Sequence, residues 1–430
     1  MNKFLSCLVL SAMLSTSVYG QSGTNSPYSQ YGLGDLSDQG VGFNKGMSGV
    51  GLAFRKGNEV NPLNPASYSS VDSLSMILDA GLSGQLTHYN ENGNRLNAKS
   101  GGFDYVVALF RAFKNVGVSV GVRPYSNVGY SYSTVEKLPE VNLSVPVKYE
   151  GSGGLNQVFL GAGWRIFKPL SVGFNVAYFW GDINRSIGTT NTTINSLSKE
   201  YSSSTHNYKL DFGLQYDQPI GKNKTDFLTI GATYGVGHNL KTDPICRVLS
   251  KNTTQQKADS TEYEITDGLS LPTSIGVGVA YRRNNVFRVG ADFQMQKWGS
   301  LDYPNYEATD DGADFTLKSG LLKDSYSVNV GAEWIPRYMG RNFLQRMTYR
   351  VGLGYTTPYY YINGQDGPKD FHVSFGFGIP IINGYNNRSV LNISAQWQRR
   401  SADQLIKEDT FRINIGLTFN ERWFAKWKVE

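Results

Sequence analysis

The chain has 430 residues, a formal net charge of +6 at pH 7 and 18% charged residues. The charge is spread along the sequence and forms no basic run interleaved with aromatic side chains, which argues against nucleic-acid binding. Of the two cysteines, Cys7 lies in an N-terminal apolar run and only Cys246 follows it, so no internal disulfide framework is expected. The mean hydropathy of −0.34 fits a soluble protein, but it also fits a membrane barrel in which half of each strand is polar.

Residues 1–20 have the pattern of a secretory signal peptide. Lys3 is followed by an apolar run that ends near Leu14, and Val18-Tyr19-Gly20 before Gln21 is an acceptable small-residue cleavage site. The apolar run is too short to span a membrane. The sequence therefore predicts an exported protein from which this segment is removed.

Residues 21–73 show no strand periodicity and are rich in Gly, Ser, Asn and Pro. From residue 74 to 420, apolar and small polar residues alternate with period two, as in Phe371–Ile379 and again in Phe411–Phe419. Such alternation predicts strands with one apolar and one polar face. The predicted strands span 75–88, 101–111, 115–134, 147–167, 170–188, 204–219, 226–241, 266–282, 286–299, 321–336, 346–362, 369–383, 389–401 and 408–420.

The connections between these strands alternate in length. Short ones, such as Ala112–Lys114 and Lys168–Pro169, are separated by long polar ones. Transmembrane barrels have short periplasmic turns and long outer loops, whereas a soluble sandwich has no reason to sort its loops in this way. The pattern favours an all-β, antiparallel barrel of about fourteen strands in the bacterial outer membrane over a soluble sandwich. The long polar connections are Asn90–Ser100, Gly188–Ser203, Arg247–Thr266 and Asp302–Ser319.

Residues 421–430 form an aromatic and basic tail after the last predicted strand. Trp423, Phe424 and Trp427 are expected to pack at the periplasmic rim, with Lys426 and Lys428 near lipid phosphates. A frayed terminus is the alternative interpretation.

Several motifs, in their shared order, resemble the FadL-like family of long-chain fatty-acid transporters. The opening 26–32, Ser-Pro-Tyr-Ser-Gln-Tyr-Gly, is similar to a divergent subgroup of that family. The resemblance covers nearly the whole mature chain. Its motifs are 46–51 (Gly-Met-Ser-Gly-Val-Gly), Asn64-Pro65-Ala66, 271–281 with 289–293 and Trp298, 323–326 with 331–336, and 350–355 with 358–360.

The resemblance implies a monomeric barrel of fourteen strands that is plugged by the segment before the first strand. In that family, hydrophobic molecules bind in the lumen and leave sideways through a gap at a kinked third strand. Pro124 lies in the third predicted strand and is the candidate for such a gap, because proline has no N–H for the ladder. A proline at a strand end near the outer rim is the alternative. The residues that correspond to the plug are Gly46, Met47, Gly49, Gly51, Asn64, Pro65 and Ala66.

No constellation of catalytic or metal-binding residues is apparent. The four histidines have no metal-ligand spacing with another His or with Cys. His88 and His206 lie near predicted rims, but nothing there assembles a base with an orienting carboxylate. His372 and Arg412 face the lumen by alternation, where polar residues are expected in any barrel. We therefore expect a protein that is not an enzyme and needs no metal or other cofactor.

Three functions remain open from the sequence. The first is passive uptake of hydrophobic, fatty-acid-like molecules, with membrane lipid and a hydrophobic ligand as the partners. The second is a non-transporting role as a subunit or partner of an outer-membrane protein assembly or secretion machine, which implies envelope protein partners. The third, a general porin for hydrophilic solutes, is the least favoured because the Gly-rich segment before the first strand argues for occlusion.

Overall fold

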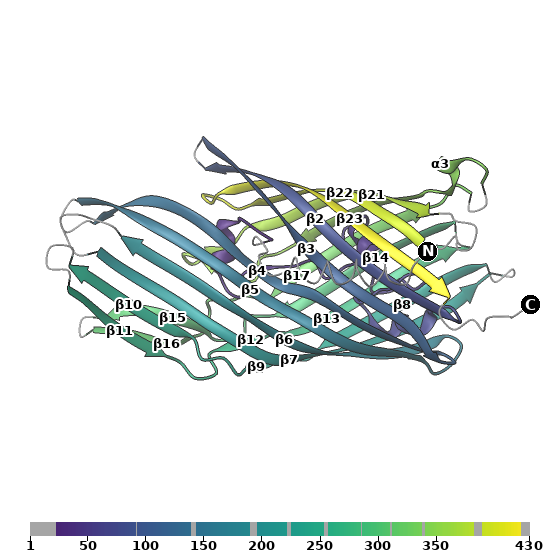
Figure 1. Cartoon of the computed structure of the whole chain (residues 1–430), viewed down its shortest axis with the longest axis horizontal. Coiled ribbons are helices and arrows are strands. Elements are labelled where there is room, and N and C mark those ends of the chain that lie inside the picture. The colour runs from purple at the N-terminus through teal and green to yellow at the C-terminus, as the bar shows by residue number, and fades with distance from the viewer. Residues whose placement is uncertain are drawn as a thin grey trace, which may run out of the picture.

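The computed structural model describes residues 23–91, 93–138, 143–189, 196–221, 225–252, 257–284, 286–309, 312–337, 340–381 and 389–422. Fourteen antiparallel strands form a closed barrel, because the first barrel strand, β2, pairs with the last, β23, along its whole length (Figure 1). This confirms the fold class expected from the alternation. The predicted signal peptide, 1–20, and residues 423–430 of the predicted tail lie outside the described residues, and β23 runs on to Arg422.

Each of the fourteen predicted strands corresponds to one wall strand, and neighbours in the chain are neighbours in the wall. The period-two pattern in the sequence located these strands, because one face of each strand meets lipid and the other meets the lumen. The wall strands are β2 (Ser75–Glu91), β3 (Asn94–Phe113), β4 (Val116–Leu138), β5 (Leu143–Arg165), β6 (Leu170–Thr189), β7 (Ser196–Ile220), β8 (Asp226–Gly235), β13 (Thr273–Arg283), β14 (Phe287–Lys297), β17 (Ser325–Trp334), β18 (Thr348–Thr356), β21 (Lys369–Ile381), β22 (Ser389–Ser401) and β23 (Lys407–Arg422).

The outer face of the wall is an apolar belt. On β6, the outward side chains of Phe174, Val176 and Tyr178 are about half exposed, whereas the inward Asn175 and Ala177 are buried. Tyr178 stacks on Trp180, and the next outward residue, Asp182, is polar. The apolar belt on β6 therefore ends near Trp180, with stacked aromatics where an interfacial girdle belongs.

The long polar connections contain more strand than the sequence indicated. β10 (Ile245–Asn252) and β11 (Lys257–Glu264) extend the sheet from β7, and β15 (Tyr303–Thr309) and β16 (Gly312–Lys318) form a separate hairpin. The interpretation of these segments as loops was wrong. Their strands are rich in polar and charged residues and carry no sustained period-two contrast, although Cys246 of β10 and Phe315 of β16 are buried. In Figure 1 these elements lie at the end of the barrel opposite α3 (Phe343–Arg346).

Small elements complete the described chain. β9 (His238–Leu240) pairs with β12 (Leu269–Leu271), and β19 (Tyr361–Ile362) pairs with β20 (Gln365–Asp366). None of the helices in the described part of the chain is long and apolar enough to cross a membrane.

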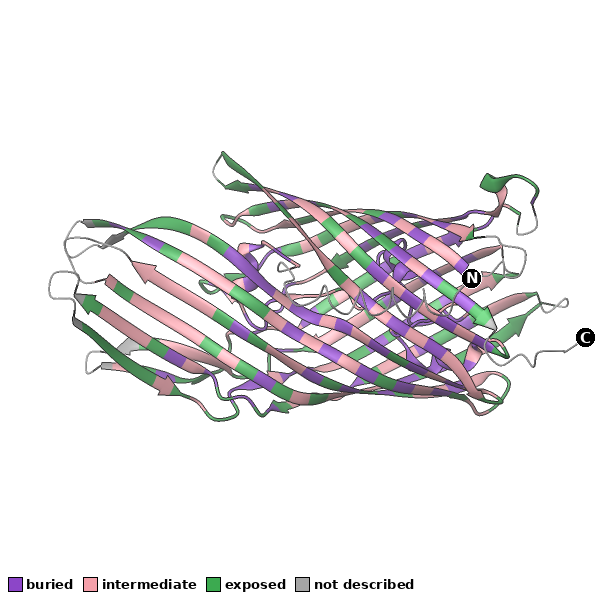
Figure 2. Cartoon of the chain, in the orientation of Figure 1, coloured by how far each residue is buried: buried purple, intermediate pink, exposed green. Residues whose placement is uncertain are grey.

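Residues 23–73, before the first wall strand, lie inside the barrel. They contain η2 (Pro27–Gln30), β1 (Asp35–Leu36), α2 (Gly42–Lys45) and η3 (Pro65–Ser70). In Figure 2 the short helices of this segment appear purple, as buried residues enclosed by the strands. η3 contacts β4, β5, β6 and β7, and α2 contacts β2, β21, β22 and β23, so the segment reaches both sides of the wall.

Candidate functional site: the filled lumen and the gap between β3 and β4

Glycines on the inner face of the wall let the backbone of residues 42–73 lie directly against the strands. A Cβ added at Gly231 would lie 2.1 Å from the Leu52 carbonyl oxygen, and one at Gly352 would lie 2.2 Å from the Met47 carbonyl carbon. Such distances leave no room for a side chain or for a permeating molecule at these points. Inward glycines of the wall strands are thus the points where the wall meets the N-terminal segment.

The first group of predicted plug residues lies against β14, β17, β18 and β21. Met47 is fully buried beside Gly331 and Gly352, and Gly46 packs on Arg350 and Gly376. Gly49 has φ +81°, a left-handed conformation that favours glycine. The Gly51 N–H donates to the Asp292 carboxylate at 2.7 Å.

The predicted tripeptide Asn64-Pro65-Ala66 lies on the other side of the lumen and begins η3. The Asn64 side chain accepts from the Ala66 N–H at 3.1 Å and donates to the Leu52 carbonyl at 2.7 Å. Pro65 contacts inward glycines of β5, β6 and β7. The structure therefore brings both groups of predicted residues into the lumen, while their action as a plug stays a prediction.

A buried ionic cluster ties the segment to the wall. The Glu333 carboxylate accepts from Arg288 at 2.9 Å and from Arg350 at 2.7 Å. Arg288 also donates to Glu59, and Lys56 lies 3.9 Å from Glu333, so two residues of the segment join three residues of β14, β17 and β18. Three cations face two anions, and removal of either carboxylate would leave buried charge uncompensated.

Other polar side chains of the wall bind the backbone of the segment. Asp292 accepts from the N–H groups of both Gly51 and Leu52, at 2.7 and 2.9 Å. The Gly42 N–H donates to the Tyr105 hydroxyl at 2.7 Å, and that hydroxyl donates to Asp79. Asp292 lies within the motif 289–293, but no role was predicted for it, for Tyr105 or for Asp79, although isolated charges at inward strand positions were a usable signal.

Arg55 places a further cation inside the lumen. Its guanidinium donates to Ser171 on β6 at 3.1 Å and to Ser69 of the segment at 3.3 Å. Burial lowers the pKa of Arg55 to about 10, so the side chain stays protonated at neutral pH.

The other half of the lumen holds a large apolar cluster, beside ion pairs in which Arg400 contacts Asp35 of the segment at 2.8 Å and Asp370 at 3.1 Å. Tyr125 of β4 packs edge-on against Phe179 of β6 with ring centroids 5.0 Å apart, and Trp298 lies 4.6 Å from Tyr359. The segment contributes Tyr28 and Leu33 to this cluster, which we call the outer cluster. Its buried members are Tyr28, Leu33, Tyr125, Val128, Tyr130, Leu155, Phe179, Ile183, Leu240, Leu269, Leu271, Trp298, Leu322, Tyr359, Tyr360 and Ile362.

The two predicted polar lumen residues are bonded to neighbours on the wall. His372 Nδ1 lies 3.3 Å from Asp370 on its own strand, and Arg412 donates to Gln85 of the adjacent β2 at 2.8 Å. No group of three or more His, Cys, Asp or Glu side chains that could hold a metal ion occurs within the ranges that the structure describes.

The wall is interrupted between β3 and β4. Their ladder runs from Phe113/Val116 to Val106/Val122 and ends there, two residues before Pro124. Beyond this point β4 pairs with β5 on one side and with β1 of the N-terminal segment at Ser126 and Asn127 on the other. In Figure 1 the β2–β3 hairpin diverges from β4 and β5 on this side. Release of a ligand through this gap stays a prediction.

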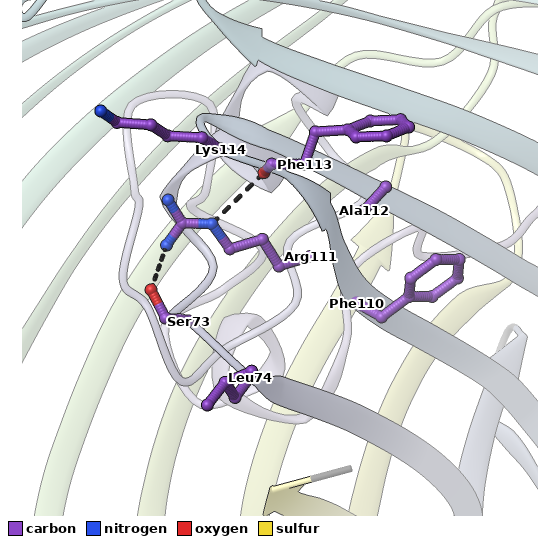
Figure 3. Close-up of a pocket in the computed structure, with 7 residues that line it drawn as sticks. All are labelled: Ser73, Leu74, Phe110, Arg111, Ala112, Phe113 and Lys114. Carbon is purple, nitrogen blue, oxygen red and sulfur yellow. Dashed lines mark hydrogen bonds between the residues drawn. The ribbon is translucent and has the colours of Figure 1, made fainter. Parts of the chain in front are cut away.

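A shallow hollow of about 720 Å³ lies where β3 turns into β4 (Figure 3). Arg111 crosses it and donates to the Ser73 hydroxyl at 2.7 Å and to the Phe113 carbonyl at 3.3 Å. Phe113 is 75% exposed. Its lining residues belong to the turn between β3 and β4 and to the start of β2, so the hollow lies at the rim with the short turns.

A closed barrel of fourteen strands with an apolar belt on its outer face defines a transmembrane β-barrel. The family model described as BamG matches residues 1–430, and the chain belongs to the BamG family. None of the curated proteins matches the chain.

Solved structures with the same fold include hydrocarbon transporters. The toluene transporter TodX of Pseudomonas putida has a TM-score of 0.62 at 15% identity, with 91% of this chain and 100% of that chain covered. The toluene transporter TbuX of Ralstonia pickettii has a TM-score of 0.59 at 15% identity, with 89% and 98% covered. A FadL homologue of Pseudomonas aeruginosa has a TM-score of 0.58 at 12% identity, with 90% and 98% covered. At these identities the likeness shows the fold.

Proposed function

We propose that this barrel acts as a non-transporting subunit or partner of an outer-membrane protein assembly or secretion machine. The observation that carries the proposal is the filling of the lumen by the chain itself, in both halves. Passage of a solute would require the N-terminal segment to leave the glycine-lined wall and the ionic cluster together, and buried charges of this kind are costly to separate.

The family supports this function. Membership of the BamG family favours the assembly-machine interpretation among the three functions left open by the sequence. The chain also devotes much of its length to strands beyond the apolar belt: β7 has 25 residues, whereas β8 has 10. A transmembrane strand needs about 9–11 residues, so the longer wall strands offer surface to other proteins outside the membrane.

The test is gentle detergent extraction of the tagged protein from its native outer membrane, followed by native gel electrophoresis and identification of co-eluting proteins and lipids. The proposal predicts a large species with stoichiometric envelope proteins. A single barrel-sized species that carries fatty-acid-like molecules would contradict it and would favour uptake.

Passive uptake of hydrophobic molecules is the second candidate, favoured by the gap between β3 and β4 beside the outer cluster. The outer cluster gathers apolar side chains from β4, β5 and β6 next to this gap, so a hydrophobic ligand would bind there by displacing side chains such as Tyr28 and Leu33. Uptake of a labelled fatty acid or toluene by cells with and without the protein tests this function. Equal rates would exclude it.

A further inference from the structure

We infer that the gap-facing edge of β4, from Gly129 to Val135, binds an extended segment of another envelope protein by strand addition. The inference rests on the proposed function, because it names where a partner in an assembly machine would bind.

The first observation is that this edge has no neighbouring wall strand. The β3–β4 ladder ends at Val122, while the β4–β5 ladder continues to Leu138. Gly129 shows which backbone groups point into the gap, because its N–H donates to the Ser29 hydroxyl oxygen at 3.2 Å and its carbonyl accepts from the same hydroxyl at 3.5 Å. Alternation along a strand then directs the N–H and C=O groups of Ser131, Ser133 and Val135 into the gap as well.

The second observation is that the same edge already accepts a short strand. β1 pairs antiparallel with it through Asp35↔Asn127 and Leu36↔Ser126, and the Ser37 N–H donates to the Tyr125 carbonyl at 2.9 Å. The contacts from Ser37 and Ser29 thus occupy the edge as far as Gly129. Beyond it, within the described ranges, the backbone pairing of β4 is with β5 alone.

The third observation is that the free part of the edge lacks the usual protection against strand addition. Residues 131–135, Ser-Tyr-Ser-Thr-Val, contain no proline and no charge, and the register shift of β4 lies earlier, between Pro124 and Ser126. Val135 is 66% exposed. By contrast, another open edge, that of β11, carries Lys257, Asp259, Glu262 and Glu264. Tyr, Thr and Val favour strands, so the free edge is suited to pairing with an extended chain.

The position of the edge indicates the kind of segment that binds. Register places Trp180 of β6 opposite Asn156 of β5, and Asn156 opposite Pro124. Residues after Pro124 therefore lie beyond the aromatic end of the belt, on the side with the long connections. The outward side chains there are Ser131, Ser133 and Val135. The partner segment is thus an uncharged, β-branched-rich extended strand outside the lipid core.

The first test uses Ser133→Pro, which removes a gap-facing N–H and leaves the N–H groups that face β5. Ser133→Ala, which keeps the backbone donor, is the matched control. In native extracts we expect about a tenfold loss of the co-purifying protein for Ser133→Pro and no loss for Ser133→Ala, since tenfold corresponds to about 1.4 kcal/mol. Heat-modifiable migration on gels checks that both variants keep the barrel.

The second test identifies the occupant with a photo-cross-linking residue at Val135, and with one at Val328 on the far wall as the control, where the side chain is 47% exposed. The inference predicts a protein adduct at Val135 that is absent at Val328. An adduct only with lipid, or with a second copy of this chain, would overturn it.

If Ser133→Pro keeps the partner and Val135 gives no protein adduct, the inference fails and the proposed function stands. Absence of any partner from the unaltered protein would overturn both.

Discussion

Both halves of the lumen contain an apolar cluster and buried ion pairs, but the N-terminal segment meets the wall differently in each half. The half that holds residues 42–73 brings backbone against glycine and closes with ion pairs around Glu333, whereas the outer cluster brings aromatic and aliphatic side chains together. Backbone-to-glycine contacts and paired charges depend on one geometry, because a shift of either partner leaves a clash or an unpaired group. Apolar side chains tolerate rearrangement, and volume can be exchanged within them. The contacts of residues 42–73 therefore hold the N-terminal segment in one position, whereas the side chains of the outer cluster can rearrange.

The largest effect is expected from breaking the ionic cluster. Glu333→Ala leaves Arg288 and Arg350 buried without their shared carboxylate, and we expect a loss of about 3–5 kcal/mol in the free energy of unfolding. Denaturant unfolding in detergent micelles measures it. Glu262→Ala, which breaks the ion pair with Arg247 at the surface, is the control and should change stability by less than about 1 kcal/mol. Equal effects of the two substitutions would show that the ionic cluster does not hold the N-terminal segment in place.

The second-largest effect is expected from opening a cavity in the outer cluster. Leu155 is fully buried and points inward from β5, so Leu155→Ala should cost about 2–5 kcal/mol and leave an apolar cavity. Benzene should then raise the melting temperature of this variant but not of the parent protein. Leu160→Ala, at a lipid-facing position of the same strand that is 59% exposed, is the control. Absence of benzene binding would mean that the cluster does not retain a cavity.

The smallest of the three effects concerns the glycine contacts. Gly352→Ala adds a methyl group that would overlap the Met47 backbone, and we expect a loss of about 1–3 kcal/mol together with faster proteolysis of the N-terminal segment. Gly84→Ala is the matched control, because a Cβ at Gly84 meets nothing within 4 Å. If both variants behave alike, the close approach of backbone to wall is not what holds the segment.

The wall was predictable from the sequence because lipid and lumen impose a period of two on every spanning strand. Strands outside the belt, such as β10 and β11, were missed because no lipid face imposes that contrast on their sequences. The lumen contacts were less predictable, since they join residues far apart in the chain, such as Glu59 and Arg288. Alternation could place Arg288 and Glu333 inward, but it could not pair them. Pro124 was singled out for its missing N–H, whereas the end of the β3–β4 ladder and its partial cover by β1 required the structure.

The central claim is that the protein works with its lumen filled. The hydroxyl oxygens of Ser48 in the segment and Ser374 on β21 lie 2.9 Å apart, so Ser48→Cys with Ser374→Cys, in a Cys246→Ser background, offers a disulfide that fixes the segment to the wall. We would measure recovery of the envelope protein complex and uptake of a labelled hydrophobic probe, in the oxidised and the reduced state. If the protein works with its lumen filled, the same complex is recovered from the oxidised and the reduced protein, and neither takes up the probe. Uptake that is present when the disulfide is reduced and lost when it is oxidised would contradict it.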